Sequence, residues 1–159
     1  MIRREWEEAG TYLGAAITLF ESLGLGGWLP VARLDEAELH AGQGRIDEAL
    51  ALVDETLVAT EEFGHLRVPA LLRRANLLAD MNTDLSETAE AYRVAIESAQ
   101  NQQAKYYELF ATTSFARWLK SQGRATEVRA MLASIYNWFT EGFETLALKE
   151  AATLLHELA

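Results

Sequence analysis

The sequence predicts an all-α protein built from stacked helical hairpins, and three observations support this prediction. Apolar residues recur with helical spacing along the chain of 159 residues, and no run alternates with the two-residue period of a strand. Short glycine-containing breaks separate the periodic segments. Equivalent positions of successive helix pairs carry related residue types, which indicates an internal repeat.

Eight helices are expected from the periodic segments and the breaks between them. They cover about 3–22, 29–42, 45–63, 66–81, 85–101, 103–121, 124–139 and 146–158. Pro30 and Pro69 each fall early in a segment, where a missing backbone N–H costs least. Asp84 with Glu87 three residues later has the form of a capping box for the fifth helix, and Thr145 is a candidate cap for the last.

The segment 45–63 has two apolar stripes instead of one. The first contains Ile46, Ala49, Leu50, Val53 and Leu57, and the second contains Leu52, Thr56, Ala59 and Phe63. A helix that rests on one neighbour needs only one stripe, so two stripes predict neighbours on two sides. This is the position of an inner helix in a stacked array.

The repeat becomes visible when successive helix pairs are aligned. On the second helices, equivalent positions hold Ala49, Thr88 and Val128, then Val53, Tyr92 and Leu132, then Thr56, Ala95 and Ile135. On the first helices, one position is alanine in every pair, at Ala37, Ala75 and Ala116. Small residues at such positions let two helix backbones approach closely. Residues 8–24 match only the second-helix pattern, so the chain is expected to begin with half a repeat.

A single domain over residues 1–159 is therefore expected. Its parts would be a half repeat, three helix pairs and a capping helix, at 1–24, 28–64, 65–102, 103–140 and 145–159.

Small residues in these slots, large apolar residues nearby and "QGR" between helices resemble the tetratricopeptide repeat. The resemblance covers three helix pairs and implies a right-handed α-α superhelix whose first helices line a concave groove. The spacing here is longer than the roughly 34 residues of that repeat. The proline typical of repeat ends is also missing from its usual place.

A second resemblance concerns "IYNWFTEGFETLALKEAATLLHEL" at 135–158, and above all "WFTEGF" at 138–143. This segment is similar to the extreme C-terminus of large bacterial signalling proteins. Those proteins join an adenylate/guanylate cyclase domain, or another regulatory domain, to a predicted ATPase and a tetratricopeptide-like tail. The resemblance implies a stand-alone relative or an excised tail. The sequence contains no GxxxxGK[ST] phosphate loop, so neither activity is assigned to any residue.

Composition and charge argue against several classes of partner and site. The net charge is −10, from 24 acidic and 14 basic side chains, and such a surface repels nucleic-acid phosphates. The chain has no cysteine, so it can form neither a disulfide nor a thiolate metal site. No run approaches the ~18 apolar residues needed to span a bilayer, and the N-terminus lacks a signal core. The sequence predicts a cytoplasmic protein without nucleic-acid or membrane partners.

Two features of the sequence resemble chemical sites, one a calcium loop and the other a proton-transfer pair. The stretch 80–91 places oxygen-bearing side chains at alternate positions, as a calcium loop does, but Leu85 and Ala91 stand where that loop needs glycine and a bidentate glutamate. We interpret it as a polar loop with a helix cap. Glu36 and His40 lie one helical turn apart and could transfer a proton. Without a third partner or a nucleophile, they are interpreted as a packed histidine hydrogen-bonded to Glu36.

His65 and His156 are isolated, so neither a metal nor a cofactor is expected. Aromatic residues are dense toward the C-terminus, at Trp118, Tyr136, Trp138, Phe139 and Phe143. They could form a patch for a partner, but we interpret them as sealing the end of the stack beneath a capping helix at 146–158.

The sequence thus predicts a non-catalytic interaction module that binds a peptide or partner protein on its concave face. By register, that face would contain Leu34, Glu38, Leu72, Asn76, Phe110, Thr113, Arg117 and Lys120. The row formed by Glu38, Asn76 and Arg117 would grade from acidic to basic and orient the ligand; the alternative is an ordinary solvated face. The alternative function is a regulatory or oligomerising tail of a larger cyclase/ATPase signalling protein, and a homodimer is compatible with either function.

Overall fold

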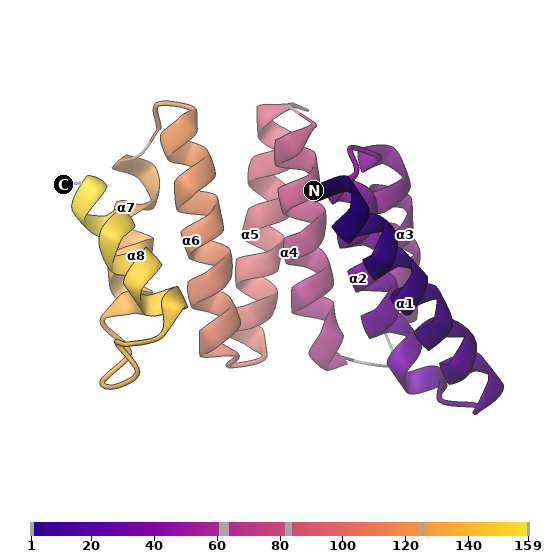
Figure 1. Ribbon diagram of the computed structural model, residues 1–159. Helices are drawn as coiled ribbons and strands as arrows, with labels where there is room; N and C mark the ends of the chain where they lie inside the picture. The colour runs from indigo at the N-terminus through magenta and orange to yellow at the C-terminus, as the bar shows by residue number, and fades with distance from the viewer. Residues whose placement is uncertain (1, 61–63, 82–83, 125, 159) are drawn as a thin grey trace. The chain divides into compact units, whose positions relative to one another are not determined.

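The chain is all-helical in a computed structural model, which describes residues 2–60, 64–81, 84–124 and 126–158, with side chains from residue 6 onward. Within these ranges there is no strand, which confirms the predicted all-α class. The elements are α1 (Ile2–Ser22), η1 (Gly26–Trp28), α2 (Leu29–Gly42), α3 (Ile46–Ala59), α4 (Gly64–Asp80), α5 (Leu85–Asn101), α6 (Lys105–Ser121), α7 (Thr126–Tyr136) and α8 (Leu146–Glu157) (Figure 1).

The helix limits match the sequence prediction within a few residues, with two informative differences. The helix expected over 124–139 ends at Tyr136, because Trp138 and Phe139 donate their backbone N–H groups three residues back, to Ile135 and Tyr136. This tighter pattern is typical of a fraying helix end. Pro69 lies inside α4, which begins earlier than expected.

The chain divides into two compact units, Met1–Thr83 and Asp84–Ala159. The division falls between α4 and α5, within the helix pair expected at 65–102.

In the first unit, each helix packs on the next, and α2 also contacts α4. The inner helix α3 lies between α2 and α4, which confirms the two neighbours that its two stripes predict. The core of this unit contains Leu34, Ala37, Ala49, Val53, Ala70 and Leu77. Ala37 and Ala49 are completely inaccessible to solvent, as expected where two helix backbones approach closely.

In the second unit, α5 packs on α6, while α6, α7 and α8 contact one another. An aromatic cluster joins α5 to α6: the Tyr92 ring lies 5.3 Å from Phe115 and 5.9 Å from Trp118, measured between centroids. All three side chains are buried, so Trp118 belongs to the α5–α6 core. Such pairs add to the stability gained from the area that they bury.

The repeated "QGR" forms the same turn in both units. Gly44 and Gly123 have φ values of 80° and 73°, the left-handed region that favours glycine. The following residue then donates back across the helix end, with Arg45 N 2.9 Å from His40 O and Arg124 N 2.8 Å from Leu119 O. This is a helix C-terminal capping turn, so part of the sequence repeat has a purely conformational cause.

The three aligned alanines are equally buried: Ala37, Ala75 and Ala116 have no exposed surface.

Of the two predicted caps, Asp84 is confirmed, since its carboxylate accepts from Ser86 N at 2.7 Å and Glu87 N at 3.3 Å. The Thr145 cap is wrong: this residue precedes α8, but its hydroxyl donates to Gly142 O instead of accepting from the helix.

Candidate binding groove

Three of the residues predicted to face a partner lie in the interior. Leu34 is 7 % exposed, and Leu72 and Thr113 are 5 % exposed. The Thr113 hydroxyl also donates to Leu109 O at 2.7 Å within α6. In the folded chain these side chains therefore contribute to the core and not to an open surface.

The predicted charged residues are exposed but paired. In the first unit, Arg73 of α4 lies 2.6 Å from Glu38 of α2, and Asn76 is half-buried on α4. In the second unit, Arg117 and Lys120 of α6 are paired with carboxylates of α8. Each charged end of the predicted row is thus balanced within its own unit.

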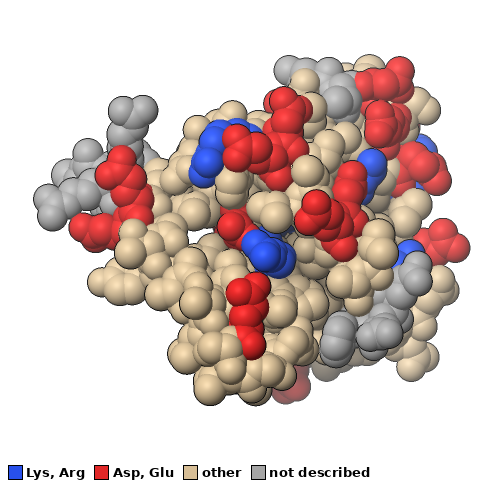
Figure 2. Space-filling view, turned by 90° about the vertical axis from the view of Figure 1, so that its right-hand side faces the viewer, with Lys and Arg blue, Asp and Glu red and all other residues tan. Residues whose placement is uncertain are grey.

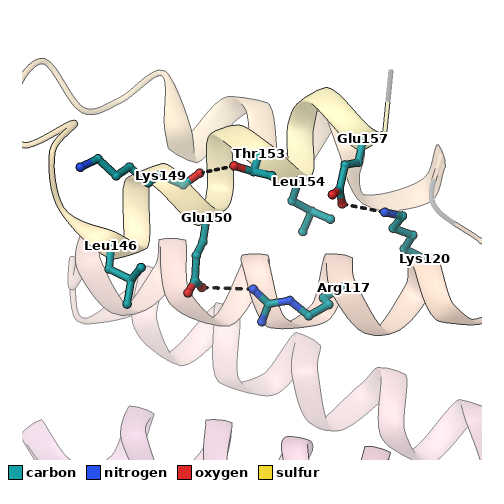
Figure 3. A pocket seen from close by; sticks show the side chains of 8 residues that line it. All are labelled: Arg117, Lys120, Leu146, Lys149, Glu150, Thr153, Leu154 and Glu157. Carbon is teal, nitrogen blue, oxygen red and sulfur yellow. Dashed lines mark hydrogen bonds and ion pairs between the residues drawn. The ribbon is translucent and has the colours of Figure 1, made fainter.

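The surface between α6 and α8 forms an open groove of about 480 Å³. Its lining residues are Arg117, Lys120, Leu146, Lys149, Glu150, Thr153, Leu154 and Glu157 (Figure 3). Leu154 is buried between the two helices and forms the apolar floor, whereas the rim is charged. The sequence prediction found Arg117 and Lys120 but missed the α8 residues, because that helix was interpreted only as a cap.

Two ion pairs cross this groove. Arg117 lies 3.1 Å from Glu150, and Lys120 lies 2.6 Å from Glu157 (Figure 3). The hydrogen bond from Lys120 holds the pKa of the Glu157 carboxyl below its usual value. Both pairs join residues in the same order along α6 and α8, so the two helices run in the same direction here.

The exposed side of α6 continues from the groove as an aromatic surface. Tyr106 and Phe110 are 55 % and 41 % exposed and stack with 6.2 Å between ring centroids. Their spacing puts them on the same helix face as Arg117 and Lys120. This face is aromatic in its first half and basic in its second. Phe110 was predicted for it; Tyr106 was missed, although its i,i+4 spacing from Phe110 was a usable signal.

The structure does not bring Glu36 and His40 together. Glu36 instead accepts from Arg33 at 2.7 Å, whereas His40 Nδ1 lies 2.9 Å from Glu48 Oε2 of α3, without the alignment of a hydrogen bond. The predicted hydrogen bond between Glu36 and His40 is therefore wrong. The hairpin turn brings α3 beside the end of α2, so a residue from another helix supplies the neighbouring carboxylate.

The oxygen-rich stretch 80–91 is occupied by structural contacts. Asp84 caps α5, and Thr88 is buried in that helix. Asp80 is at the end of α4, where burial raises the pKa of its carboxyl, and Asn82 lies outside the described residues. His65 and His156 are exposed. In the described ranges no three His, Asp or Glu side chains gather as a metal site would require.

The C-terminal aromatic residues divide into buried and exposed groups. Tyr136 and Phe139 are half-buried, but Trp138 and Phe143 are 58 % and 42 % exposed. The apolar stripe of α8 packs inward through Leu148, Ala151 and Leu154. The capping helix thus covers part of this group only.

The face shown in Figure 2 carries more acidic than basic side chains, in keeping with the net charge of −10. Among the helices described, none combines the length and the apolar character needed to cross a bilayer. Comparison of the sequence with protein-family models, with curated proteins and with solved structures finds no match. The all-α class of the chain therefore rests on the helices of the structure itself.

Proposed function

We propose that the chain is a non-catalytic, cytoplasmic interaction module, a right-handed tetratricopeptide-like solenoid that binds a protein or peptide along the exposed face of α6. The observation that carries this proposal is the α6–α8 groove with its charged rim and the aromatic surface beside it. The solenoid arrangement is supported within each unit by the contacts of α2 with α4 and of α6 with α8, since helices two apart touch in such arrays.

The proposed site has the composition of a recognition surface. Exposed aromatic side chains and arginine are enriched at protein interfaces, because they offer large contact area together with hydrogen bonding. Tyr106, Phe110 and Arg117 provide these groups on one helix. A rigid helix needs little ordering when a ligand binds.

Selection from a random peptide library tests this function. Peptides are selected on the unmodified protein and then measured against Arg117→Glu and, as a matched control, Arg45→Glu. Arg45 also forms an exposed ion pair, with Glu48, but lies directly before α3 in the other unit. Peptides that lose affinity only for Arg117→Glu support the proposal. A set of peptides that binds all three proteins equally would contradict it.

A second proposal, a regulatory or oligomerising tail, is favoured by the segment 138–143. This part lies between α7 and α8, and both Trp138 and Phe143 remain substantially exposed. Exposed large aromatics of this kind are typical of surfaces that contact another domain or subunit. Light scattering across a range of concentrations tests the oligomerising form: a dimer that dissociates on Trp138→Ser supports it, and a monomer at all concentrations contradicts it.

A further inference from the structure

We infer that the α6–α8 groove recognises an acidic segment with a large apolar side chain at one end, and that Glu150 and Glu157 occupy the carboxylate positions until it binds. This inference rests on the proposed function and specifies its ligand. It starts from the charge of the groove, where three cations, Arg117, Lys120 and Lys149, accompany two carboxylates, Glu150 and Glu157, on a strongly acidic chain.

The two ion pairs across the groove show that its basic residues bind carboxylates. Arg117 and Lys120 each bind one carboxylate of α8, at 3.1 Å and 2.6 Å. All four side chains are 41–58 % exposed, so water solvates them well when they separate. Carboxylates of a ligand can therefore replace those of α8 at little cost. Lys149 points away from the other charged side chains of the groove (Figure 3), and its ammonium lies 3.0 Å from the Glu144 carboxylate.

The aromatic half of α6 fixes the direction of the ligand. Helix rise places Phe110 ~10 Å before Arg117 and ~15 Å before Lys120. Leu146, 73 % exposed, lines the groove at the start of α8 (Figure 3). Because α6 and α8 run in the same direction, this end of the groove is the one toward the first half of α6. A ligand with its apolar side chain at this end and its carboxylates beyond it would contact both the aromatic and the basic half of the α6 face. In a helical ligand that separation corresponds to about seven residues.

The charge of the whole chain gives selectivity. An acidic segment is repelled by most of a surface with a net charge of −10, so the basic rim of the groove is the favourable place to bind. Attraction between exposed charges weakens as salt is added, and binding should weaken with it.

A pair of synthetic peptides tests the inference. Each is a helix-forming, fluorescent peptide with one Phe near its N-terminus and, seven and eleven residues later on the same helix face, either two Glu or two Gln. Fluorescence anisotropy then measures affinity. We expect the Glu peptide to bind about tenfold or more tightly than the Gln peptide, because its hydrogen bonds are charge-assisted.

Variants of the groove distinguish replacement of the Glu150 and Glu157 carboxylates by the ligand from non-specific charge attraction. Glu150→Gln with Glu157→Gln removes the competing carboxylates, so the Glu peptide should bind several-fold more tightly. Lys120→Gln should reduce its affinity toward that of the Gln peptide. Glu127→Gln is the matched control, since Glu127 pairs with Arg124 in the same unit but outside the groove.

Unchanged or weaker binding of the Glu peptide to the Glu150→Gln, Glu157→Gln protein would overturn the inference. Equal affinity for both peptides, reduced in parallel by Tyr106→Ala, would also overturn the acidic ligand but leave the proposed function intact. Absence of binding by either peptide, together with no library peptide sensitive to Arg117→Glu, would overturn both proposals.

Discussion

The helices α1 and α8 differ in how completely the fold covers them. On α8 the apolar stripe is buried, and Leu146 is the only strongly exposed large apolar residue among those described. On α1, Tyr12 and Leu19 are 77 % and 53 % exposed, and Leu23, directly after the helix, is 61 % exposed. Helical spacing puts Tyr12 and Leu19 on one side of the helix, away from the buried Ile17.

The comparison shows that α1 has the sequence of an inner helix. Like α3, it carries apolar residues on two sides, but in the described part of the first unit it contacts only α2 and η1, whereas α3 contacts α2 and α4. The helix α8 instead buries its single apolar stripe in its contacts with α6 and α7. This agrees with the expectation that residues 8–24 match only the second-helix pattern.

The largest expected difference between the two helices concerns core truncation. Leu148→Ala in α8 should reduce the free energy of unfolding by about 2–5 kcal/mol, because Leu148 is 3 % exposed and its loss leaves a cavity. Leu19→Ala in α1 should reduce it by about 1 kcal/mol or less, because more than half of that side chain is already exposed. Urea denaturation measures both. A comparable loss for Leu19→Ala would show that its face is covered in solution.

The next prediction compares a glycine at the α1–α2 contact, Gly42, with an exposed glycine of α1, Gly14. A Cβ atom on Gly42 of α2 would lie 2.5 Å from the Trp6 ring of α1, whereas one on Gly14 of α1 would meet nothing within 4 Å. Gly42→Ala should destabilise the protein by roughly 1–3 kcal/mol through this overlap. Gly14→Ala should stabilise it by about 0.4–1 kcal/mol by restricting the unfolded chain.

Thermal unfolding of the two variants provides the measurement. The chain has four tryptophans, so the NMR signal of the Trp6 indole N–H is used to report on that side chain in the Gly42→Ala protein. If both substitutions stabilise the protein equally, the close approach of α1 to α2 is not maintained in solution.

Local sequence was sufficient to predict most of the fold. Helical periodicity depends on each segment alone, so the helices and the burial of Ala37, Ala75 and Ala116 could be predicted. The Asp84 cap could be predicted for the same reason, because its partners are two and three residues away. Contacts between helices could not be read in this way: His40 faces Glu48 of α3, although Glu36 is nearer in sequence.

The candidate site was predictable only in part. The positions of Phe110, Arg117 and Lys120 on α6 follow from register within one helix. Their pairing with α8 depends on packing between helices, which no spacing in the sequence specifies. Thr113 illustrates the limit: it was assigned to the open face of α6 but is buried, because the boundary of a helix face depends on its neighbours.

A smaller effect is expected at the helix ends, where α1 and α2 end in the same kind of turn. Gly24 after α1 has a φ of 67°, and Leu25 N donates to Phe20 O at 2.8 Å, as in the turn at Gly44. Gln103 after α5 adopts the same conformation at a φ of 54°. Gly24→Ala should cost about 1 kcal/mol, and Gln103→Gly should gain about as much, because only glycine is unstrained there. Equal and negligible shifts in urea midpoint would contradict the assignment.

The smallest expected effect concerns the pKa of Glu157, which α8 places beside Lys120 of α6. Because the Lys120 hydrogen bond lowers the pKa of Glu157 below its ordinary 4.5, this contact stabilises the fold above pH 4.5 and is lost as the pH falls through the lowered pKa. Lys120→Gln should raise the NMR titration midpoint of the Glu157 carboxyl toward 4.5 while changing the stability at neutral pH little. Lys149→Gln, which removes a neighbouring cation paired with Glu144 and not with Glu157, is the control and should leave that midpoint nearly unchanged. A midpoint that does not move in Lys120→Gln would mean that the pair between α6 and α8 does not persist in solution, and the groove rim would then present a free lysine to a ligand.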